Sequence, residues 1–296
     1  MVSRGDFLQA GAVAGAVSVA AIPERSRAAG GKLRMRWFGG GVYELATPDD
    51  SSIVLVDAWI WNNTGWTAFG IEKPPELQSA VAYAAHLKSR NPQSLLVALT
   101  HDHVDHMGDY FEMLPAMVAA GLPVMTVGQS DLFRVALVPK FKAAGLDPAT
   151  IVLNKGAAMN FGGTAAHGAI HARLVPAIHS TFAGYPSAGF MLDIAGTRVY
   201  ASGDTDLFGE MESLGERYHP QLAVLSTGNG AFTMGPDDAA HACKLTGVTH
   251  AVPVHYAHNP LVLGTQCGEM FRTAVAKVSP HTGVTVMRPG ESALVG

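Results

Sequence analysis

The chain has 296 residues, of which 48% are hydrophobic and 15% are charged, and this composition excludes an intrinsically disordered protein. Its formal net charge is -4, without a block of Lys or Arg, so neither a nucleic acid nor an anionic membrane is an expected partner. The two cysteines, Cys243 and Cys267, are too few for a disulfide scaffold and form no C-x-x-C motif.

Residues 1–30 have the layout of an export signal. Arg4 precedes an apolar, small-residue stretch at 10–21, and a segment of mostly small and polar residues follows up to Gly30. The apolar stretch is shorter than the ~20 residues of a membrane span. Residues 3–9 resemble a twin-arginine signal in which Gly5 replaces the second arginine. We therefore expect an exported protein, periplasmic or extracellular, with one domain over 31–296 and no membrane span in its mature part. A cytoplasmic location is the alternative if the degenerate signal does not function.

The mature chain reads as alternating strands and helices. Apolar or alternating runs predict strands at 32–38, 42–46, 53–56, 94–100, 123–127, 150–153, 159–161, 170–178, 189–194, 197–202, 221–225, 249–254 and 284–286. Helical spacing and capping residues predict helices over 76–89, 111–120, 131–142, 236–245 and 271–278. The order of these elements predicts an α/β protein.

Potential metal ligands crowd into residues 100–106, directly after the apolar strand at 94–100. His101 and His103 are two apart in an extended chain, so their side chains project to the same side. Asp105 and His106 follow one turn later. Because such a cluster has no packing rationale and needs ligands to offset its desolvation, it predicts a site for two adjacent cations.

Three later apolar strands also end on potential ligands. His179 follows the strand at 170–178, Asp204 the strand at 197–202, and His255 the strand at 249–254. Strand ends in layered α/β proteins converge at one edge of the sheet, so these side chains are expected to join the first cluster. The other histidines lack this placement, and His258 is left unassigned.

The order H-x-H-x-D-H, His, Asp, His resembles the metallo-β-lactamase superfamily over residues 32–290. Residues 35–39, 203–211, 229–236 and 253–256 are similar to the branch that contains ascorbate-6-phosphate lactonase and its uncharacterised metal-dependent hydrolase relatives. The resemblance implies a four-layer αβ/βα sandwich with the metal site at the strand ends. Relatives in that branch often carry a histidine where this chain has Gly40.

The resemblance also implies a role for each candidate ligand. The first metal would be held by His101, His103 and His179. The second would be held by Asp105, His106 and His255, with Asp204 bridging the two metals. Asp57, at the end of the strand 53–56, is expected to orient a ligand histidine rather than to bind metal. Five imidazoles and two carboxylates suit two Zn²⁺ ions, with Mn²⁺ or Fe²⁺ as alternatives.

Such a site implies hydrolysis. Two cations that share a water lower its pKa from ~15.7 toward ~7 and provide a hydroxide for attack on a carbonyl or phosphoryl centre. Asp105 or Asp204 would then pass a proton to the leaving oxygen, as the catalytic carboxylates. The branch favours a small-molecule ester, above all a lactone. The alternatives are a phosphodiesterase, a hydrolytic dehalogenase and, from a different class, a non-catalytic exported metal-binding protein.

Two loops are expected to contact the substrate. Trp61 and Trp66 belong to an aromatic loop at 59–69 that would form an apolar wall, with a loop packed onto the core as the alternative. Asn229 and Thr233 belong to a glycine-rich stretch at 227–235 that would bind substrate oxygens, with a turn and helix start as the alternative. The branch includes higher oligomers, so a homo-oligomer is one expected state.

Overall fold

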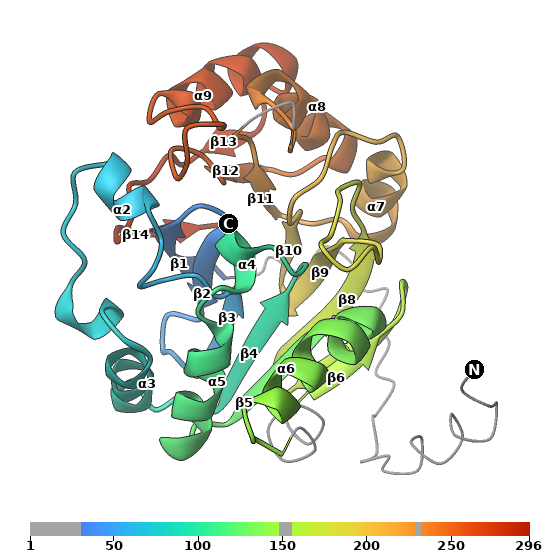
Figure 1. Ribbon diagram of the computed structural model, residues 1–296. Coiled ribbons are helices and arrows are strands. Elements are labelled where there is room, and N and C mark those ends of the chain that lie inside the picture. The colour runs from blue at the N-terminus through green and yellow to red at the C-terminus, as the bar shows by residue number, and fades with distance from the viewer. Residues whose placement is uncertain (1–30, 148–155, 229–231) are drawn as a thin grey trace.

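The computed structural model describes residues 31–147, 156–228 and 232–296. Over these residues the strands form two seven-stranded sheets that face each other, with helices on both outer sides (Figure 1). The predicted four-layer αβ/βα sandwich is confirmed.

The first sheet has the strand order β14-β1-β2-β3-β4-β5-β6. Its strands are β1 (Leu33–Gly39), β2 (Val42–Ala46), β3 (Ser52–Val56), β4 (Ser94–Leu99), β5 (Val124–Gln129), β6 (Gly156–Met159) and β14 (Ser292–Val295). From β3 to β6 the neighbours are parallel, so their carboxyl ends lie at one edge. The strand β3 is apolar from Ile53 to Val56 because both its faces are buried: Ile53 packs toward the helices and Val54 toward the other sheet.

The second sheet has the order β13-β12-β11-β10-β9-β8-β7. Its strands are β7 (Thr164–His167), β8 (Ile170–Pro176), β9 (Ala188–Ile194), β10 (Thr197–Ala201), β11 (Leu222–Ser226), β12 (His250–Val254) and β13 (Gly283–Val284). Here β10, β11, β12 and β13 are parallel neighbours, whereas β7 to β10 are antiparallel. The carboxyl ends of β10 and β12 therefore lie at the same edge.

Helices cover the outer face of each sheet (Figure 1). The first sheet is covered by α3 (Ala80–Ser89), α5 (Tyr110–Ala119) and α6 (Val138–Ala143), and the second by α7 (Met211–Tyr218), α8 (Pro236–Thr246) and α9 (Cys267–Val278). Shorter turns are α2 (Gly65–Ala68), η1 (Pro75–Leu77), α4 (Val104–Met107) and the π-type turn η2 (Leu132–Leu137). Three apolar layers follow, one between the sheets and one under each set of helices.

Several predicted elements differ in extent. The helix predicted at 76–89 is divided into η1 and α3, because Ser79 caps α3 by accepting a hydrogen bond from the Ala82 backbone N at 3.3 Å. The helix predicted at 131–142 begins as η2 and continues as α6. The strand predicted at 159–161 lies earlier, in β6, and the strand predicted at 150–153 falls outside the described residues.

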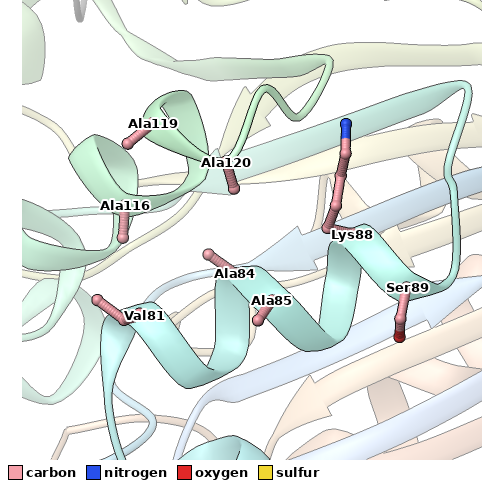
Figure 2. Close-up of a pocket in the computed structure, with 8 residues that line it drawn as sticks. All are labelled: Val81, Ala84, Ala85, Lys88, Ser89, Ala116, Ala119 and Ala120. Atoms are coloured by element: carbon pink, nitrogen blue, oxygen red, sulfur yellow. The ribbon is translucent and has the colours of Figure 1, made fainter.

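A shallow groove runs between α3 and α5 on the outside of the first sheet (Figure 2). Its lining is mostly alanine: Val81, Ala84, Ala85, Lys88, Ser89, Ala116, Ala119 and Ala120. Small side chains let the two helices pack closely, and the lining includes none of the candidate ligands. Within the described ranges no helix combines the length and apolarity that crossing a membrane requires.

Candidate metal centre

The ends of four strands position the candidate ligands. His101 and His103 follow β4, His179 follows β8, Asp204 follows β10 and His255 follows β12. Backbone geometry then aims the next two ligands, because His103 is extended and caps the short helix α4, which carries Asp105 and His106. These two residues consequently sit on a helical turn over the edge of the sheet, one in its first turn and one in its last.

Asp204 lies at the middle of the site. Its Oδ2 is 3.1 Å from His106 Nε2, 3.0 Å from His255 Nε2 and 3.7 Å from His179 Nε2. The carboxylate is 2% exposed, so it faces protein and not solvent. One oxygen therefore lies within reach of three imidazoles, which come from the helix α4 and from the segments after β8 and β12.

Among the described residues, three groups of potential ligand atoms lie at or beside this carboxylate, each with its atoms within 4.8 Å of one another. The groups are His101–His103–His179, His101–His106–Asp204 and Asp105–His255–His258. The structure therefore brings together all seven residues that the sequence nominates as ligands. It also adds His258, which the sequence left unassigned.

Unpaired polar atoms show that the site fits a cation. In the described parts of the chain, His101 Nε2, Asp204 Oδ1, His255 Nδ1 and His258 Nδ1 are buried without a hydrogen-bond partner. Buried polar atoms without partners are costly and rare, and their concentration here is relieved by a positive ion. Imidazole and carboxylate donors suit Zn²⁺ and also Mn²⁺ or Fe²⁺.

Asp57 supports the ligands from behind. It is fully buried at the end of β3, accepts hydrogen bonds from Thr100 N and Thr100 Oγ1 at 2.8 Å each, and faces His106 Nδ1 at 2.6 Å. The same Thr100 hydroxyl lies 2.9 Å from His101 Nδ1. Asp57 therefore fixes the ring of His106 directly and that of His101 through Thr100, which is the role the sequence predicts for it.

The carboxylates and imidazoles of the site perturb one another strongly. Burial acts to raise the pKa of Asp204, but the charges of His106 and His255 outweigh it and hold the pKa well below its usual range. Burial acts to lower the pKa of His255, but Asp204 and Asp105 raise it to about 9. For His101 burial dominates and lowers the pKa well below its usual value, so this imidazole is neutral and ready to coordinate.

The residues predicted to bind substrate lie in different surroundings. Trp66 is 2% exposed and its indole N–H donates to the Ile60 carbonyl at 3.1 Å, while Trp61 is 8% exposed. Thr233 is buried, and Asn229 lies outside the described residues. The aromatic loop thus packs onto the core, and the substrate roles of these four residues stay predictions.

An aromatic side chain that the sequence did not nominate stands beside the metal ligands. Phe182 is 73% exposed, and its ring centroid lies 4.4 Å from that of His103. Asp102 holds this loop by accepting hydrogen bonds from Phe182 N at 2.7 Å and Ala183 N at 3.0 Å. Phe182 and His258 each follow a predicted ligand by three residues, and that short separation was the signal that could have identified them.

Fold and site together define a metal-dependent hydrolase. The family model described as Beta-lactamase superfamily domain matches residues 54–256, and the chain belongs to the metallo-β-lactamase superfamily. It is similar to a UPF0173 metal-dependent hydrolase of Pyrobaculum islandicum, with 33% identity over 88% of this chain and 99% of the relative. A UPF0173 metal-dependent hydrolase of Rubrobacter xylanophilus is 31% identical over 88% of this chain and 96% of the relative.

Solved structures agree with this assignment. Igni18, described as a novel metallo hydrolase from Ignicoccus hospitalis, superposes with a TM-score of 0.66 at 26% identity, covering 89% of this chain and 98% of its own. The superfamily predicted from the histidine and aspartate pattern is confirmed.

Proposed function

We propose that the protein is a binuclear metallohydrolase that opens a small uncharged ester, with lactones as the leading substrate class. The observation that carries this proposal is the position of Asp204. Its Oδ2 lies between imidazoles of two separate ligand groups, 3.7 Å from His179 and 3.0 Å from His255. A carboxylate shared in this way is what two neighbouring cations require.

Two divalent cations supply a Lewis acid for the substrate oxygen and lower the pKa of a shared water. The protein's own carboxylates divide the remaining work. Asp204 is 2% exposed and serves as the bridge, whereas the side chain of Asp105 is 29% exposed and can reach a leaving oxygen. Asp105 Oδ2 faces His255 at 3.5 Å and His258 at 3.2 Å, which leaves Oδ1 to handle the proton.

The rim of the site supports an apolar, uncharged substrate. Phe182 stands against His103, and Val104 is 62% exposed on the adjoining turn. In the described parts of the chain, the ion pairs of Asp105 and Asp204 are with imidazoles and not with Lys or Arg. Phe182 and Val104 offer apolar surface beside the ligands, and we therefore favour a lactone over a sugar phosphate or a phosphodiester.

Metal analysis and a substrate panel test the proposal. The full chain should bind two divalent ions and hydrolyse lactones faster than phosphodiesters or aryl halides. The double variant His101→Ala/His103→Ala should lose metal from the first group and lose turnover. Full metal content and activity in that variant refute the assignment, and two bound metals without hydrolysis of any panel member favour a metal-binding protein.

We also propose that the protein is exported, on the basis of the signal-like layout of residues 1–30. Mass spectrometry of the protein from its native host tests this. A terminus near residue 31 supports export, and an intact Met1 or Val2 terminus contradicts it.

A further inference from the structure

His258 is a buried imidazole on the loop that follows β12. Its side chain is 1% exposed, and its Nε2 lies 3.2 Å from Asp105 Oδ2. The ring centroid is 4.5 Å from that of His255, with the two planes at 67°. Asp105, His255 and His258 form one of the three groups whose ligand atoms lie within 4.8 Å of one another.

The surroundings of His258 hold its ring in this position. A Cβ at Gly40 would lie 3.6 Å from His258 Cγ, an ordinary van der Waals distance, so the turn at Gly40 packs beside the ring. Trp59 meets the ring edge-on at a centroid distance of 6.0 Å, and the Thr64 hydroxyl donates to the His258 carbonyl. The ring therefore has little freedom to turn away from Asp105.

A structural role does not account for the polarity of this ring. Among the described residues, His258 Nδ1 and His255 Nδ1 are buried without a hydrogen-bond partner, and His258 Nε2 is directed at the carboxylate of Asp105. If this residue served only for packing, an apolar side chain would give a more stable fold, because an unpaired buried polar atom costs about 1–3 kcal/mol. A cation beside Asp105 would coordinate His258 Nε2 and so accounts for a polar ring at this place.

We propose that His258 is a ligand of the second metal position, which it completes with Asp105 and His255. This assignment rests on the proposed binuclear centre and changes its composition. His101, His103 and His179 form the first position, while His106 and Asp204 lie between the two. The second position would then take Asp105, His255 and His258 as its own ligands beside the shared Asp204.

The experiment measures how many metal ions the full chain binds and with what affinity. Metal-free protein is titrated with Zn²⁺ by calorimetry and with Co²⁺ by visible absorption, for the wild type, His258→Ala and His258→Gln. Glutamine keeps most of the ring's volume, so it serves if the alanine variant does not fold, and circular dichroism checks both. The matched control is His250→Ala, since that half-buried histidine bonds Thr285 Oγ1 at 2.9 Å, away from the cluster.

The wild type and His250→Ala should bind two equivalents. Both His258 variants should retain the first and bind the second at least about tenfold more weakly, since even the loss of an outer-shell partner costs about 10–100-fold in metal affinity. The d–d absorption of the second Co²⁺ should change with it. A second equivalent bound with the wild-type Kd by either folded variant overturns the assignment of His258.

These outcomes separate this assignment from the proposed function. If the wild type binds two ions but hydrolyses no ester, the proposed function is refuted. Loss of the second ion in His258→Ala would still support the assignment of His258 as a metal ligand. If the wild type hydrolyses lactones and His258→Ala binds both ions normally, the function stands and the ligand assignment fails.

Discussion

Replacing Asp57 by asparagine tests whether its hydrogen bond to His106 positions this histidine for metal binding. The amide oxygen can still accept from Thr100, but its NH₂ group then faces the N–H at His106 Nδ1, which lies 2.6 Å from the carboxylate. A charge-assisted hydrogen bond, worth about 1.5–3 kcal/mol, becomes a contact between two donors in a fully buried place. Because breaking a buried charged pair costs about 3–5 kcal/mol, we expect the free energy of unfolding to fall by about 3 kcal/mol. Metal affinity should fall about 10–100-fold.

Urea denaturation of the metal-free protein and calorimetric Zn²⁺ titration measure the two effects. The matched control is Asp109→Asn. Asp109 is also a buried carboxylate, but it accepts from the backbone N of Ile60 at 2.5 Å and of Trp61 at 2.8 Å and has no histidine partner among its hydrogen bonds. The Asp109→Asn variant should be less stable than the wild type and should bind metal with the wild-type affinity. Wild-type metal affinity in folded Asp57→Asn, or equal weakening in both variants, refutes the reasoning.

Three further predictions concern the ligands and the rim. A Cβ at Gly41 would lie 2.6 Å from His106 Cε1 and 3.3 Å from His255 Cδ2, so Gly41→Ala should weaken metal binding in a titration, whereas Gly209→Ala, with open space around it, should not. The pKa of His255 is raised to about 9 in the metal-free protein, so this group stabilises the fold fully below about pH 6.5 and loses that contribution as the pH rises through 9. Metal must displace this proton, so Zn²⁺ affinity should rise over the same window, with protons released in calorimetry in two buffers; a flat pH profile contradicts the assignment. Phe182→Ala should raise KM for apolar lactones several-fold and leave metal content unchanged, and a wild-type KM removes Phe182 from the substrate site.

The ligands that follow strands were predictable because burial forces a simple pattern on the sequence. An apolar run such as 94–99 has both faces covered, and the first polar residues after it must lie at the edge of the sheet. His101, His179, Asp204 and His255 all obey this rule, and the structure brings them together. The pairing of sheets and helices came from the family resemblance.

Residues placed by tertiary contacts were not predictable in this way. His258 and Phe182 lie in loops, where no periodicity indicates which way a side chain points. Trp66 packs into the core, which the sequence pattern of an aromatic loop does not distinguish from a substrate wall, and its substrate role stays a prediction. The helix α7 was missed since it contains Gly215, a poor helix former; a Cβ there would lie 2.6 Å from the Thr246 carbonyl, so close packing against α8 favours the glycine.

Each of the two sheets positions only some of the candidate metal ligands. β3 and β4 deliver His106 with its supporting Asp57, and the second sheet delivers Asp204, which is 98 positions further along the chain. Bound metal would therefore cross-link the two halves of the sandwich. A covalent cross-link that closes a loop of about 100 residues stabilises a fold by about 4.7 kcal/mol, because it restricts the unfolded chain. Neither half can hold the centre alone, so removing the metal should abolish the site and also lower the free energy of unfolding of the folded metal-free protein.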